Sequence, residues 1–227
     1  MKIISKYISL FLIIVLSLTI GCFISLDIKE KFLDIFLGKY NSITVRYLII
    51  FLIIFIDYKI FKSFYDHSLA FRYKSFYKLF TKNILLELFY ISMMIISIFI
   101  PLIFIHFKNF MINIKYMVLI IINTIIICLI ITSLVRIIDV KIKNKIISSC
   151  LFIGFYTILE FITENYNFYF ANNIIFDFHN TFDYAYVIKY PFLLLIIMFF
   201  ILMFLNMLFF NSVQKNNYLL GDNNEEN

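Results

Sequence analysis

Charged residues are scarce in this chain. Of its 227 residues, 15% are Asp, Glu, Lys or Arg, whereas 63% are hydrophobic. An ordinary soluble domain is about 25% charged and about 45–50% apolar. A single water-soluble core cannot hide this much apolar surface, but a lipid bilayer can receive it. The composition therefore predicts an integral membrane protein rather than a soluble domain.

Residues that hold phosphates or metals are also few. The chain has four glycines, which are scattered at Gly21, Gly38, Gly154 and Gly221. They form no Gly-x-x-x-x-Gly-Lys-Ser/Thr loop for nucleotide phosphates. The three cysteines lie far apart within apolar runs and are expected to pack as small hydrophobic side chains. The three histidines fall on different loops, so we expect no metal site and no cofactor.

Catalytic motifs are missing as well. There is no His-Glu-x-x-His motif, and no Ser or Cys has a plausible base near it in the sequence. The adjacent glutamates of the paired-glutamate proteases occur here only in the polar tail, at Glu225 and Glu226. The sequence therefore predicts a protein that is not an enzyme.

Six apolar runs are long enough, or nearly so, to cross a bilayer as helices, which needs about 20 residues. They are Ile8–Leu26, Tyr47–Phe61, Ile84–His106, Met117–Ile138, Ile146–Thr163 and Pro191–Asn211. We predict an all-α protein with six transmembrane helices. A single membrane domain would cover residues 1–211, and the polar residues 212–227 would form a disordered cytoplasmic tail.

The basic residues predict how these helices are oriented. With the N-terminus inside, the cytoplasmic segments hold thirteen of the twenty Lys and Arg residues, and the external segments hold seven. Such a bias favours an arrangement with both the N-terminus and the C-terminus in the cytoplasm of a cell-membrane protein. Anionic lipid headgroups account for the net charge of +6, so no nucleic acid partner is needed.

Two loops between the spans are rich in aromatic residues. Asn165–Tyr190, between spans five and six, contains ten Phe or Tyr among its 26 residues. Such rings prefer the headgroup layer, either as short interfacial helices or as an aromatic belt that anchors the sixth span. The internal loop after span two is basic as well. Wound as a helix, Leu69–Lys82 places Lys74, Lys78 and Lys82 opposite an apolar face.

This internal helix allows two interpretations. Its lysines can bind anionic phosphates at the inner membrane surface. Alternatively, it is a coupling helix that docks in a cleft of a soluble partner and pushes on the third span. The residues of that coupling helix are Phe71, Arg72, Tyr73, Lys74, Ser75, Phe76, Tyr77 and Lys78.

The layout as a whole resembles the small permease subunits of ABC-2 type exporters. The stretch Arg72–Ser75, followed by aromatic and basic residues and then by Asn83–Leu86, is similar to the internal loop of small Gram-positive members linked to peptide or lantibiotic export and immunity. This resemblance implies a separate ATP-binding cassette ATPase subunit as partner. It also implies a homodimer, or a heterodimer with a sister permease. The alternative is a non-transporting immunity or scaffold protein of the membrane.

A few polar residues lie within the predicted spans and are candidates for function. Glu87 is expected to be satisfied by Lys82 or by interfacial water. Glu160 and Glu164 lie four residues apart and either line an outer vestibule or mark a solvated helix end. Arg136 and Asp139 can pair along one helix. The amides that can bond between helices are Asn123 and Asn206.

Overall fold

The computed structural model describes residues 2–26, 43–61, 76–112, 114–142, 144–166 and 191–222. Seven helices make up almost all of this part of the chain, which confirms the all-α prediction. They are α1 (Lys2–Ser25), α3 (Ile43–Phe61), α5 (Phe76–Ile105), α6 (Phe107–Ile112), α7 (Ile114–Ile142), α8 (Lys145–Tyr166) and α11 (Pro191–Asp222).

Each of the six predicted apolar runs lies on one long helix, apart from the last residues of the first and third runs, Leu26 and His106. Several helices extend further than the runs. α5 begins at Phe76, eight residues before the predicted start at Ile84, and α11 continues past Asn211 to Asp222. No glycine or proline lies in either extension before Gly221, so nothing in the backbone stops the helix. The predicted tail is therefore helical as far as Asp222, and residues 223–227 lie outside the described ranges.

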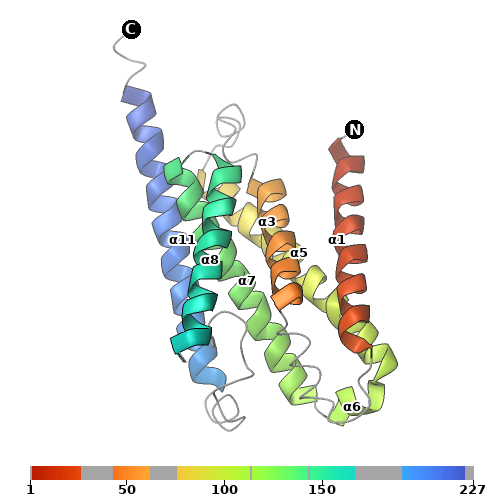
Figure 1. The fold of residues 1–227 in the computed structure, drawn as a ribbon. Helices are drawn as coiled ribbons and strands as arrows, with labels where there is room; N and C mark the ends of the chain where they lie inside the picture. The colour runs from red at the N-terminus through yellow and green to blue at the C-terminus, as the bar shows by residue number, and fades with distance from the viewer. Residues whose placement is uncertain are drawn as a thin grey trace.

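The six long helices alternate in direction through the bundle (Figure 1). α1 begins and α11 ends at the same end, where the two chain termini lie. We call this the N/C end of the bundle. α3 and α7 finish there, whereas α5 and α8 start there. Residues from these four helices can therefore meet at one depth although they are far apart in the sequence.

Three of the described helices contain segments long and apolar enough to cross a membrane. These segments are Ile8–Ser25 of α1, Phe80–Ile105 of α5 and Met117–Ile142 of α7. α3 is 19 residues long and carries three charged residues, Arg46, Asp57 and Lys59. Large apolar side chains such as Phe104 and Phe200 point away from the bundle. The three long helices and this apolar exterior suggest an integral membrane protein.

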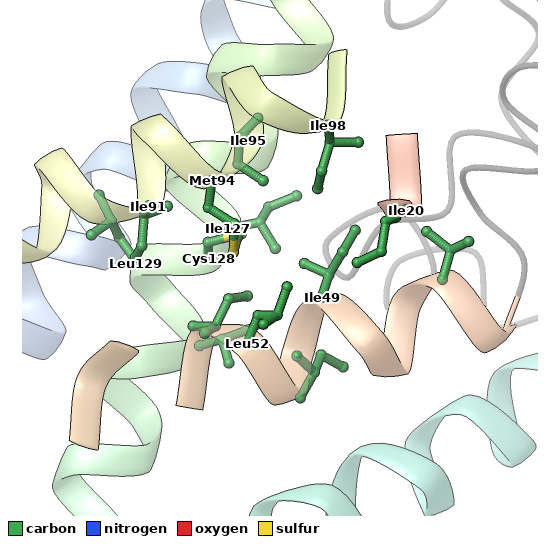
Figure 2. Close-up of a cluster of buried hydrophobic side chains, with 14 of the residues drawn as sticks. Ile20, Ile49, Leu52, Ile91, Met94, Ile95, Ile98, Ile127, Cys128 and Leu129 are labelled. Carbon is green, nitrogen blue, oxygen red and sulfur yellow. The ribbon is translucent and has the colours of Figure 1, made fainter. Parts of the chain in front are cut away.

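α7 is the centre of the packing, because it contacts α3, α5, α8 and α11. Figure 2 shows the core that results, in which Ile49 and Leu52 of α3 meet Met94 of α5 and Cys128 of α7. Cys128 is buried, as the sequence predicts. Cys22 and Cys150 are instead exposed on the surface of the bundle, because they fall on the outward faces of α1 and α8.

α1 packs along α5 at a point of very close approach. A Cβ atom built on Gly21 would overlap the backbone carbonyl of Ile98 and would lie 3.0 Å from Cδ of Pro101. Small residues allow membrane helices to approach in this way. Gly154 lies on another long helix, α8, and provides a comparison. A Cβ atom built there would meet nothing within 4 Å.

These two glycines give a matched test of the α1–α5 contact. We expect Gly21→Ala to lower the free energy of unfolding by about 1–3 kcal/mol, because the added methyl group forces the two backbones apart. Gly154→Ala should change it little. Thermal unfolding in detergent micelles measures both variants, and equal midpoints for the two would contradict the close approach.

Candidate functional site

The buried guanidinium of Arg136 is the centre of the candidate site. Arg136 lies on α7, six residues before the helix ends at Ile142, which places it about 9 Å from the N/C end. It is 1% exposed and lies within an apolar segment that could cross a membrane. A charge in such a place is costly unless it is paired, so its partners decide what the site can do.

Two carboxylates from two other helices contact this guanidinium. Arg136 Nη2 donates to Glu87 Oε2 of α5 at 2.6 Å, and Arg136 Nε lies 3.1 Å from Asp57 Oδ1 of α3. Both carboxylates are completely buried. Thr132, one turn earlier on α7, accepts from Arg136 Nη2 through Oγ1 at 3.0 Å and from Nε through its carbonyl at 3.2 Å. The ion cluster Asp57–Glu87–Arg136 thus joins α3, α5 and α7.

Aromatic rings cover the cluster. The Phe61 ring centroid lies 4.2 Å from Arg136 Cζ, and that of Phe209 lies 5.6 Å away. Phe61 meets Phe209 edge to face at 6.1 Å, and Phe80 stacks on Phe209 at 5.9 Å. Cation–π contacts of this kind stabilise a guanidinium that has lost its water. The rings also bring α11 into contact with the three helices of the ion cluster.

A second polar contact lies beside the cluster. Ser148 Oγ of α8 donates to Asp139 Oδ1 of α7 at 3.2 Å, and both residues are buried. The predicted pairing of Arg136 with Asp139 along α7 is therefore wrong, because each of these side chains bonds to a residue on another helix. Arg136 reaches across to α3 and α5, where two buried carboxylates need a cation, and Asp139 bonds to α8 instead.

The partner predicted for Glu87 is also wrong. Glu87 pairs with Arg136, whereas Lys82 is exposed on α5. Lys82 lies five residues before Glu87, so the two side chains point about 140° apart around the helix. Only Glu87 faces the interior of the bundle.

A signal for this cluster was present in the sequence. Asp57 lies near the end of the second apolar run, Glu87 near the start of the third, and Arg136 near the end of the fourth. In helices that alternate in direction, these three positions fall at one depth. The three residues are 30 or more positions apart in the sequence, so a search for partners among neighbours in the chain does not find this cluster.

The other candidate residues lie elsewhere or outside the described ranges. Phe71–Ser75 are not among the described residues, and Phe76, Tyr77 and Lys78 form the first turn of α5. Most of the aromatic loop Asn165–Tyr190 is likewise outside them. Glu160 and Glu164 lie on the last two turns of α8, towards the end of the bundle opposite the N/C end, and their side chains are not described.

Of the two amides, one bonds between helices as predicted. Asn206 of α11 accepts from Ser133 Oγ of α7 at 3.5 Å, and it donates to the carbonyl of Leu202 within its own helix. The side chain of Asn123 is buried and has no hydrogen-bond partner among the described residues. His106 lies 3.0 Å from the carbonyl of Ser25 through Nε2. No group of three or more His, Cys, Asp or Glu side chains in the described ranges could hold a metal.

Comparison of the chain with protein-family models, with curated proteins and with solved structures found no match. A guanidinium held by two carboxylates from two other helices can hold the three helices in register.

The ion cluster predicts a specific pattern of stability. Arg136→Met should lower the free energy of unfolding by about 3–5 kcal/mol, because it leaves two buried carboxylates without their cation. Replacing the whole cluster, as Arg136→Met with Glu87→Met and Asp57→Leu, should restore most of that loss. Thermal unfolding in detergent measures both variants. Lys141→Met, at an exposed site on α7, is the control, and a loss as large there as in Arg136→Met would refute the pattern.

Proposed function

We propose that this chain is the membrane-spanning permease subunit of an ATP-driven exporter, which moves a peptide or an amphipathic compound across the cell membrane. The observation that carries the proposal is the arrangement of six long helices that alternate in direction, with both chain termini at one end (Figure 1). This is the arrangement that the resemblance to ABC-2 type permeases implies. All six helices would cross the bilayer.

Charge supports the placement of the N/C end in the cytoplasm. Four lysines of the described residues lie close to this end and are exposed: Lys59, Lys78, Lys82 and Lys141. Lysines flanking membrane helices are enriched on the cytoplasmic side. Lys59 also has its ammonium 5.7 Å from the ring centroid of Phe55, so its stem runs along the apolar helix while its charge reaches the headgroups.

The course of α5 supports a route for coupling to an ATPase. Phe76–Lys78, the last part of the proposed coupling segment, is continuous with α5, which carries Glu87 three turns further on. A partner that moves this first turn therefore moves Glu87 with it, because a helix transmits displacement along its axis. Glu87 is bonded to Arg136 of α7, and α7 packs against α11. Since the sequence has no phosphate-binding loop, the ATPase is a separate subunit, and the permease works as a homodimer or with a sister permease.

Co-purification tests the partner. A cassette ATPase encoded beside this chain should co-purify with the wild type and be lost from the double variant Phe71→Ala with Arg72→Ala, because these residues would fill its cleft. Phe107→Ala with Lys108→Ala, at an exposed aromatic–basic pair on α6, is the matched control and should retain the ATPase. Equal recovery in all three samples would argue against the coupling segment.

Resistance assays separate export from the alternative, a non-transporting immunity or scaffold protein. Cells that express this chain should resist a membrane-active peptide, and the resistance should disappear when the ATPase gene is deleted, because transport needs ATP. The wild-type ATPase supplied from a plasmid is the control. Resistance that survives the deletion would favour the immunity or scaffold protein.

The topology has its own test. Single cysteines at Lys74→Cys and Asn180→Cys, in a chain whose three native cysteines are replaced by serine, should react with a membrane-impermeant maleimide from opposite sides. In intact cells only the cysteine at position 180 should be labelled, since position 74 faces the cytoplasm. Labelling of both positions in intact cells would contradict the six-span arrangement.

A further inference from the structure

A second apolar cluster lies between the ion cluster and the N/C end. It is separate from the main core shown in Figure 2. Four helices each contribute one buried side chain to it, namely Phe61 of α3, Phe80 of α5, Val140 of α7 and Phe209 of α11. Each of these side chains is at most 8% exposed. We call the four residues the apolar cap.

The order of residues along the helices places the cap on the N/C side of the charges. On α3, Phe61 follows Asp57 by four residues, and on α7, Val140 follows Arg136 by the same interval. α5 runs the other way, and Phe80 precedes its charged residue by seven positions. At the rise of an α-helix, the cap residues of these three helices lie about 6–10 Å closer to the N/C end than the charges.

Apolar side chains also lie on the opposite side of the ion cluster. Ile53 of α3 and Ile91 of α5 are one turn further from the N/C end than Asp57 and Glu87, and both are completely buried in the main core. The charges therefore lie in a polar layer between two apolar layers. The shortest route from water at the N/C end to these charges passes through the cap.

Phe209 joins the rings of the cap across three helices. Its ring meets that of Phe61 edge to face at 6.1 Å between centroids, and it stacks on that of Phe80 at 5.9 Å. Phe210 adds a tilted contact with Phe80 at 5.4 Å. Loss of the Phe209 ring would therefore separate the rings of α3 and α5.

The polar layer beneath the cap contains buried atoms that can bind water. Nδ2 of Asn83, Oε1 of Glu87 and Nη1 of Arg136 have no hydrogen-bond partner among the described residues. The two nitrogens donate and the oxygen accepts, and a buried water molecule makes about three hydrogen bonds of both kinds. Asn83 lies between Phe80 and Glu87 on α5. Water that passed the cap would therefore have hydrogen-bond partners in this layer.

We propose that the apolar cap is a gate. When closed, it keeps water and small hydrophilic solutes at the N/C end from reaching the polar layer, and displacement of Phe209 admits them. Apolar constrictions exclude water in this way, because a water molecule within them loses its hydrogen bonds.

The start of α5 provides a route for opening the gate. Phe80 lies one turn after Phe76, so a displacement of the first turn of α5 moves a ring of the cap. This route rests on the proposed ATPase partner, whereas the closed gate does not.

The reactivity of a buried cysteine tests the closed gate. Ser133→Cys places a thiol at a completely buried position of α7, three residues beyond Arg136 as seen from the cap. The native cysteines are removed as Cys22→Ser, Cys128→Ala and Cys150→Ser. Silver ion, a small hydrophilic probe that binds thiols, is added to the purified protein in lipid nanodiscs. Maleimide labelling in denaturant then measures how much free thiol remains at each time.

The thiol should react slowly with silver while the cap is intact. Phe209→Ala should raise its rate of reaction by about tenfold or more, because loss of a buried ring opens the surrounding packing. Phe80→Ala removes a second ring of the cap and should have the same effect, so it serves if Phe209→Ala does not fold.

Two control variants separate the gate from other effects of losing a ring. Phe99→Ala removes a buried ring of the main core on the same helix as Phe80, so it lowers stability without opening the cap. Phe209→Leu keeps an apolar side chain in the cap and removes only the ring beside Arg136. The thiol should stay slow in both.

The other outcomes overturn the proposal. A thiol that reacts rapidly with the cap intact, or no faster in Phe209→Ala and Phe80→Ala, would show that the cap is no barrier. Equal acceleration in Phe99→Ala would assign the effect to lost stability, and equal acceleration in Phe209→Leu would assign it to the lost cation–π contact.

A deeper thiol distinguishes opening of the cap from unfolding of the bundle. Cys128 lies eight residues before Arg136 on α7, about 12 Å further from the N/C end. In a chain that keeps only this cysteine, Phe209→Ala should leave the thiol unreactive, and acceleration there would contradict a local gate. These measurements need no ATPase, so failure of the gate and failure of the exporter proposal are distinguishable.

Discussion

A guanidinium that is kept from water needs anions around it, and Arg136 imposes this need on the whole N/C end of the bundle. Its two carboxylate partners come from α3 and α5, and the rings that cover it come from α3 and α11. For these contacts to form, each helix must be placed along its own axis, and rotated about it, so that the interacting atoms lie within about an ångström of their observed positions. The ion cluster therefore adds a directional constraint on the register of these helices to their apolar packing, because a hydrogen bond forms only over a narrow range of distance and angle.

The contact between α1 and α5 depends on close packing of the two backbones rather than on charge. α1 is joined to the bundle through α5, where Gly21 lets the two backbones meet beside Pro101. Proline within α5 removes one backbone hydrogen bond, and a side chain or a neighbouring helix can compensate for that loss in a membrane protein. The first half of α5 thus contributes to the ion cluster, and its second half packs against α1. A displacement of α5 along its axis would change both contacts.

These two features give the proposed exporter a physical route for movement. The ion cluster is a specific contact between α5 and α7, which forms only when Glu87 and Arg136 lie within hydrogen-bond distance. If a partner displaces the start of α5, the ion pair between Glu87 and Arg136 links that displacement to α7. The ring of Phe209 would carry the change to α11, whose outward face is lined with exposed phenylalanine and methionine.

The sequence by itself determined the class of protein and the positions of its helices, because apolar runs of membrane length are a local property that needs no knowledge of the fold. It also placed Asp57, Glu87 and Arg136 within or beside those runs. Only the tertiary structure decided which of them meet, because their pairing depends on the rotation of three helices about their axes, and periodicity is weak in helices that are apolar on every side. For the same reason the partner expected for Glu87 was a neighbour in the chain, Lys82, which faces outward, while the actual partner lies 49 positions away on another helix. The close approach at Gly21 was equally hidden, since a glycine acquires that meaning only when a second backbone lies beside it.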